Sequence, residues 1–209
     1  MISVFKPKTS LLLALLVITG LAGRPSFETI SGAERRFLTH QLRESKANLI
    51  KSVKGLSEEQ LNYKPFPDQW SINECLQHLA ISENEIWKMT EAVIKQPTNE
   101  GKRSEIKTSD EEVLKNFSNR NQKFQTFETM LPAASSGKTT NEALSEFKHA
   151  RNHLIKFSRS TTDDLRDHVS ITPEGASDAY QLILMIAANT QKHIQQIEEL
   201  KKSKNFPKG

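Results

Sequence analysis

The sequence has a single cysteine, few glycines and few aromatic residues. Cys75 is the one cysteine among 209 residues, so the chain has no internal disulfide and its stability must come from packing. The chain has 8 glycines and 7% aromatic residues, whereas Leu, Ala, Glu, Gln and Lys are plentiful. This composition favours helices over strands. No segment alternates apolar and polar residues over a sustained run, and we therefore predict no β-sheet.

The chain also lacks a cluster of basic residues interleaved with aromatic ones, which argues against nucleic acid as a partner. Its formal net charge is +4, and two of its lysines, Lys6 and Lys8, precede the one long apolar run. Without residues 1–22, 27 basic residues stand against 25 acidic ones, a formal charge of +2. The basic character of the chain therefore comes partly from its N-terminal segment.

Residues 1–22 have the pattern of a signal peptide. Two lysines are followed by an apolar run of suitable length and by the small-x-small pattern Gly20-Leu21-Ala22. We predict cleavage after Ala22 and an exported protein, periplasmic or secreted. The apolar run is short for a membrane span, which needs roughly 20 residues, so we predict no stable span after cleavage. The alternative is an uncleaved N-terminal segment that anchors the chain.

The remaining residues, 23–209, suit one helical domain. Four segments begin with a capping box, in which a Ser or Thr side chain accepts from the third helical amide and a Glu reaches back to the cap. The boxes start at Ser31, Ser71, Ser109 and Thr139. A fifth helix is predicted to start near Ser177 and Asp178. The predicted helices cover roughly residues 32–54, 72–96, 110–130, 141–160 and 178–203.

Two of the six histidines are predicted to face the inside of the protein. His193 is in register with the apolar face of the last predicted helix, and Asn189 lies one turn earlier on that face. His78 lies on the flank of the apolar stripe of the helix over 72–96. Burying an imidazole without a partner costs a few kcal/mol, so both side chains need partners. The two interpretations are core histidines satisfied by hydrogen bonds and a metal site between the two helices.

Other candidate residues give weaker signals. His149 and His153 are four residues apart, a spacing that can hold a metal, but they point away from the apolar stripe of their helix. We predict a solvated pair there and a surface position for His40. Trp70 directly precedes the cap of the second predicted helix and can pack on Cys75 as a hydrophobic staple.

Two segments resemble a known family. GLSEEQLNYKPFPDQWSINECLQHLAISENEIW, residues 55–87, resembles the signature of the DinB/YfiT-like superfamily, and AANTQKHIQQIEEL, residues 187–200, resembles its closing helix. The resemblance covers most of residues 35–202. It implies an all-α, DinB-like four-helix bundle. Residues 98–140 would then be an elaborated middle segment that adds an extra helical segment.

The resemblance also implies a divalent metal held by three histidines, two of them in an H-x-x-x-H pattern on the closing helix. His78 and His193 match the first and the last of these ligands, and Asn189 stands at the middle position. The implied site is thus a degenerate triad of His78, Asn189 and His193 that would hold Zn or Ni. Cys75, three residues before His78, could lend a thiolate, and Glu85, two turns after it, could act as a base.

Two functions remain open on these residues. The first is a metal-dependent hydrolase or transferase acting on a small-molecule substrate, in which the metal acts as a Lewis acid or binds a thiolate cosubstrate. Export argues against the thiolate version, because such thiols are intracellular. The second is a non-catalytic exported bundle that has lost its metal and either binds a ligand or forms a homodimer. The two differ in whether His78 and His193 hold a metal.

Overall fold

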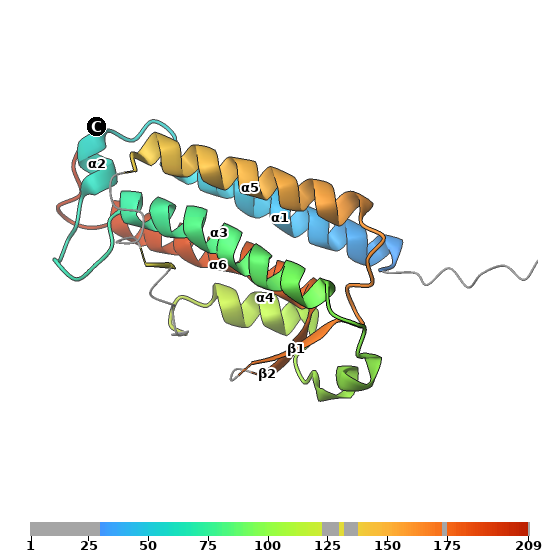
Figure 1. The fold of residues 1–209 in the computed structure, drawn as a ribbon. Helices are drawn as coiled ribbons and strands as arrows, with labels where there is room; N and C mark the ends of the chain where they lie inside the picture. Colours follow the sequence, from blue (N-terminus) through green and yellow to red (C-terminus); the bar gives the residue numbers. More distant parts are fainter. Residues whose placement is uncertain (1–29, 123–129, 132–137, 173–174, 209) are drawn as a thin grey trace, which may run out of the picture.

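Four long helices form a bundle in the computed structural model, which describes residues 30–122, 130–131, 138–172 and 175–208. The predicted signal peptide lies outside these residues, and a chain without residues 1–22 keeps every described element. The bundle helices are α1 (Gly32–Val53), α3 (Ile72–Ile94), α5 (Thr140–Ser160) and α6 (Ala179–Lys201) (Figure 1). The four-helix bundle agrees with the all-α prediction.

The four predicted capping boxes all form. In each, the cap hydroxyl accepts from the third amide of the helix and the Glu carboxylate accepts from the cap amide. A fifth box, between Ser57 and Gln60, starts the short helix α2 (Glu58–Asn62), which was not expected from the sequence. The last bundle helix starts at Ala179, where the Asp178 side chain accepts from the Gln181 amide.

The helices form a ring in the order α1, α5, α3, α6, in which each helix packs against its two neighbours. Hydrogen bonds join the start of α1 to the start of α6 (Tyr180 Oη to Glu34 O, 2.9 Å) and their ends (Lys201 Nζ to Ser52 O, 3.1 Å). These two neighbouring helices are therefore parallel. α3 and α5 are parallel as well, because Asn73 bonds Thr140 near the start of both helices.

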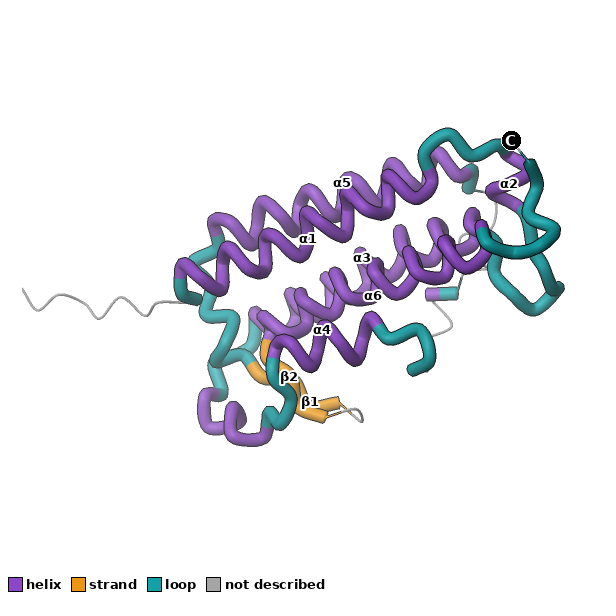
Figure 2. The backbone as a smooth tube through the Cα atoms, turned by 180° about the vertical axis from the view of Figure 1, so that it is seen from behind, coloured by secondary structure: helices purple, strands orange, loops and turns teal. Residues whose placement is uncertain are grey.

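The parallel pair α3 and α5 requires a connection that returns along the whole bundle, and the middle segment provides it. A short 3-10 helix, η1 (Glu100–Glu105), is followed by α4 (Asp110–Ser118), which lies outside the bundle against α6 (Figure 2). The prediction of a helix over 110–130 is wrong at residues 119–122, which are not helical, and its part over 123–129 lies outside the described residues. The Asn119 side chain accepts from the Asn121 amide, a local bond that competes with continued helix.

A small β-hairpin contradicts the prediction of no sheet. β1 (Val169–Thr172) pairs antiparallel with β2 (Gly175–Asp178), directly before α6. Each strand has 4 residues, too few for a sustained alternation of apolar and polar positions. Gly175 has φ of 125°, a conformation that suits glycine. The hairpin ends at Asp178 and so delivers the residue that caps α6.

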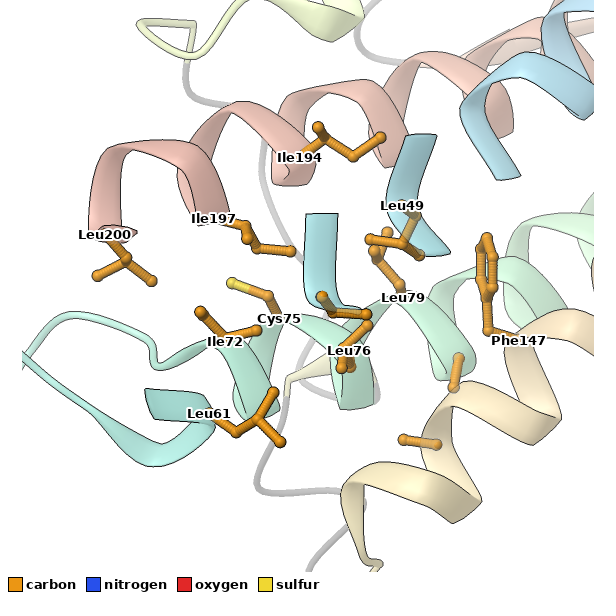
Figure 3. Packing of buried hydrophobic residues seen from close by; sticks show 13 residues of the cluster. Leu49, Leu61, Ile72, Cys75, Leu76, Leu79, Phe147, Ile194, Ile197 and Leu200 are labelled. Carbon is orange, nitrogen blue, oxygen red and sulfur yellow. The ribbon is translucent and has the colours of Figure 1, made fainter. Parts of the chain in front are cut away.

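Two apolar clusters form the core, one toward each end of the bundle. The cluster beside the N-terminus of α3 includes Leu76, Phe147 and Ile197, with Cys75 among the apolar side chains (Figure 3). The other cluster surrounds Leu38 and Ile183. Trp70 packs against the first cluster, which contains Cys75, its partner in the predicted hydrophobic staple. Within the described ranges, no helix is long and apolar enough to cross a membrane.

Candidate metal centre

The bundle brings His78 on α3 and His193 on α6 into contact. Their ring centroids are 4.6 Å apart, and the residues are 4% and 7% exposed. Trp70 covers both rings: its centroid lies 5.0 Å from that of His78 and 5.8 Å from that of His193, nearly parallel to the latter. The prediction that both histidines face the inside is therefore confirmed, and they come from antiparallel helices that meet at this level.

Each imidazole is oriented by a hydrogen bond at Nδ1. His78 Nδ1 lies 2.6 Å from the backbone oxygen of Met130, and His193 Nδ1 lies 3.1 Å from Oε1 of Gln196. The backbone oxygen of Met130 can only accept, so Nδ1 of His78 carries the proton and its Nε2 keeps its lone pair. With Oε1 of Gln196 facing His193, the same tautomer is assigned to the second ring. Histidines that bind metals generally donate their other N–H to an oxygen in this way. In this tautomer each Nε2 has the lone pair with which an imidazole can bind a metal.

Both imidazoles are held in the neutral form. Burial lowers the pKa of His78, against an opposite effect of the hydrogen bond to Met130. Burial also lowers the pKa of His193 well below its usual value, and repulsion from His78 adds to this shift. Nearby Lys192 disfavours the protonated form of both rings. Neutral imidazole is the form that binds a metal ion, so the electrostatics of the pair agree with its tautomer.

Asn189 lies on the same side of α6, one turn before His193, and is half-buried. Its Nδ2 donates to Ser82 Oγ at 3.1 Å, one turn after His78 on α3. An amide oxygen is a weaker ligand than imidazole for Zn or Ni. Within the described part of the chain, no three His, Cys, Asp or Glu residues are grouped so that they could hold a metal. The two imidazoles are suited in chemistry to a metal, whereas the position that the resemblance assigns to a third ligand offers only the amide of Asn189.

The two further candidates from the sequence do not join this pair. Cys75 is fully buried among apolar side chains, and burial raises the pKa of its thiol to about 12. A protonated thiol does not match the predicted thiolate ligand. Glu85 is paired with Lys88 at 2.6 Å on the outer part of α3, rather than with either imidazole.

The remaining histidines lie elsewhere. His149 and His153 are exposed on α5, as predicted, and the rings of His153 and Trp87 form a T-shaped contact with their centroids 5.5 Å apart. His40 is exposed beside Glu44, also as predicted. His168 is buried just before β1, and its Nδ1 has no hydrogen-bond partner within the described residues.

A buried ion pair next to the imidazole pair was missed from the sequence. Arg151 on α5 and Glu83 on α3 are 0% and 1% exposed and form two hydrogen bonds, Nε to Oε1 at 2.5 Å and Nη2 to Oε2 at 2.7 Å. Burial raises the pKa of Glu83, and the Arg151 guanidinium opposes that rise. Both residues occupy the apolar stripes of their helices. Two opposite charges at predicted core positions were therefore the feature of the sequence that could have indicated this ion pair.

Comparison with known proteins places this arrangement in a family. A model of the DinB superfamily matches residues 41–197. The chain belongs to the DinB superfamily. This membership confirms the family that the two sequence segments resemble, and with it the DinB-like bundle that was expected of the chain. No curated protein sequence matches the chain significantly.

A solved structure also matches this DinB-superfamily chain. YfiT from Bacillus subtilis superposes with a TM-score of 0.57 at 17% sequence identity, over 83% of this chain and 89% of that one. YfiT is described as "a probable metal-dependent hydrolase with an unusual four-helix bundle topology". At this identity the match establishes the fold that the two proteins share.

Proposed function

We propose that this DinB-superfamily chain binds a divalent metal through Nε2 of His78 and His193 and acts on a small molecule by hydrolysis or group transfer. The observation that carries the proposal is the pair of buried, neutral imidazoles, each with its Nδ1 proton donated to an oxygen. The description of YfiT as "a probable metal-dependent hydrolase" supports the same class of activity.

Each residue of the centre has a distinct part in this proposal. The backbone oxygen of Met130 and the side chain of Gln196 hold the Nδ1 protons and fix the two ring orientations. The oxygen of Asn189 is the third ligand, and Trp70 shields the rings from water. When bound, the metal would supply Lewis-acid chemistry, such as lowering the pKa of a bound water. An open position beside three protein ligands is typical of catalytic metal sites.

The decisive experiment is the metal content of residues 23–209, purified without a histidine tag and titrated with Zn and Ni. We expect close to one metal per chain, lost in a His193→Ala variant. The matched control is His149→Ala/His153→Ala, which removes the exposed pair on α5 and should keep the bound metal. A folded, helical wild-type chain that takes up no metal at micromolar ion would contradict the proposal.

One observation favours a second candidate, a non-catalytic bundle that has lost its metal. The Asn189 amide already hydrogen-bonds Ser82, a contact that joins α3 to α6 without any ligand. In that case the imidazoles serve as core polar residues, and the protein binds a ligand or a second copy of itself. The metal titration separates the two candidates.

We also propose that the chain is exported after cleavage behind Ala22, on the basis of its N-terminal sequence. N-terminal sequencing of the protein recovered outside the cytoplasm should give Gly23 as the first residue. Recovery of the full chain in the membrane fraction would favour the uncleaved anchor instead.

A further inference from the structure

The buried Arg151 guanidinium joins all four helices of the bundle. Besides its two bonds to Glu83 on α3, it donates to Ser45 Oγ on α1 at 2.6 Å and to Thr190 Oγ1 on α6 at 2.8 Å. A further bond reaches the Leu42 backbone oxygen at 3.1 Å. The guanidinium has five N–H groups, and these contacts engage all of its nitrogens. We call Glu83, Arg151, Ser45 and Thr190 the polar layer.

The polar layer lies close to the imidazole pair along both metal-site helices. Glu83 follows His78 by five residues, about 7.5 Å of helix, and Thr190 precedes His193 by three, about 4.5 Å, since a helix rises ~1.5 Å per residue. The Asn189 amide bonds Ser82 at the level of the polar layer, since Ser82 is adjacent to Glu83 and Asn189 is adjacent to Thr190. The helices α3 and α6 are thus joined at this level both directly and through Arg151.

A buried ion pair restricts the relative orientation of two helices more than apolar packing does, although it adds little to stability. Replacing such a pair by apolar residues of similar volume is often neutral or stabilising, so its contribution to fold stability is small. Its geometry is restrictive, however, because a two-bond contact between a guanidinium and a carboxylate is made in one relative orientation. Contacts in the two apolar clusters are non-directional, so they restrict the orientation of a helix less than the contact between the guanidinium and the carboxylate does.

We propose that Glu83 and Arg151 are positioning residues that set the placement of α3 against α6, and thereby hold His78 and His193 in contact. The measurement of metal affinity rests on the proposed function, because it requires that wild type binds a metal. The measurement of the contact between the His78 and His193 rings does not require a metal. Failure of the positioning role can therefore be distinguished from failure of the proposed metal-dependent function.

The test compares wild type with Glu83→Leu/Arg151→Met, in the same chain used for the metal titration. The double variant replaces both charges by apolar side chains, so we expect it to fold with an unfolding midpoint at or above that of wild type. We expect Zn and Ni affinity to fall by about tenfold or more, the usual size of an effect on ligand orientation. In the metal-free protein, the nuclear Overhauser contacts between the His78 and His193 rings should weaken or vanish.

Two further variants make the outcome decisive. Arg151→Lys keeps the charge but not the two-bond geometry, so it should also lose ring contacts, and it replaces the double variant if that one does not fold. Leu165→Ala, in the apolar cluster at the other end, should lower stability while leaving affinity and ring contacts as in wild type. A folded double variant with wild-type ring contacts would overturn the proposal, whether or not wild type binds metal.

Discussion

Asn189 stands where the family resemblance implies a histidine, and its chemistry decides how tightly the centre can hold a metal. We predict that Asn189→His tightens Zn and Ni binding by about tenfold or more, since each ~1.4 kcal/mol from a better ligand is a factor of ten. Isothermal titration of both metals measures the change. The matched control, Asn189→Ala, should bind more weakly than wild type. Equal affinity of all three proteins would show that this position faces away from the metal.

The neutral state of the two imidazoles has a consequence for stability. Their folded-state pKa values lie below the ordinary 6.5, so the unfolded chain binds more protons as the pH falls below that value. We therefore predict that the metal-free protein is most stable above about pH 6.5 and loses free energy of unfolding between there and the lower folded-state pKa values.

Urea unfolding at pH 7.5 and 5.0 measures this loss. The loss of free energy of unfolding should be smaller in His193→Leu, because this variant lacks one of the two buried imidazoles. The control is His40→Gln, at an exposed position, which should lose as much free energy of unfolding as wild type. An identical loss in His193→Leu and wild type would show that other groups cause the acid sensitivity.

At the residue scale, the sequence identified the imidazole pair but not the polar layer beside it. His78 and His193 could be found because a polar residue in register with an apolar stripe is conspicuous. Glu83 and Arg151 stand in the same kind of position, but a charged residue is seldom buried, and each is acceptable in the core only because of the other. Pairing between residues 68 positions apart depends on the tertiary fold, which helix periodicity does not specify.

At the scale of the elements, the N-terminal cap of α3 fixes where the helix that carries His78 begins. Ser71 accepts from the Glu74 amide, and Glu74 accepts from the Ser71 amide. We predict that Ser71→Ala lowers the free energy of unfolding by about 1 kcal/mol, because one amide loses its acceptor. The matched variant Ser109→Ala removes the cap of the peripheral helix α4 and should cost less. Urea denaturation compares them, and equal losses would mean that α4 unfolds together with the bundle.

The same local chemistry explains which elements the sequence could predict. A capping box depends on four consecutive residues, so all four predicted boxes formed at the expected residues. The end of α4 and the hairpin before α6 depend on weaker signals. A side-chain bond from Asn119 competes with the helix, and strands of 4 residues give too short a pattern to recognise.

At the scale of the whole molecule, the core consists of contacts among the chain's own side chains. The four helices are joined by two apolar clusters and by the polar layer, in which every guanidinium nitrogen of Arg151 has a hydrogen-bond partner. We predict that treatment with a chelator leaves the far-ultraviolet circular dichroism unchanged and lowers the melting temperature by no more than the linkage to a bound ligand requires. Loss of helical signal on chelation would show that metal binding and folding are coupled, as in small zinc domains.

The order of the helices around the ring also governs when this core can form. α1 is made first, but its neighbours α5 and α6 come from the second half of the chain, on the far side of the long connection. Until α6 has been synthesised, the apolar stripe of α1 lacks one of its two partners, and contacts distant in sequence are slow to form. We therefore expect a nascent chain of this topology to complete its core only when synthesis is nearly finished, a delay that would suit the proposed export.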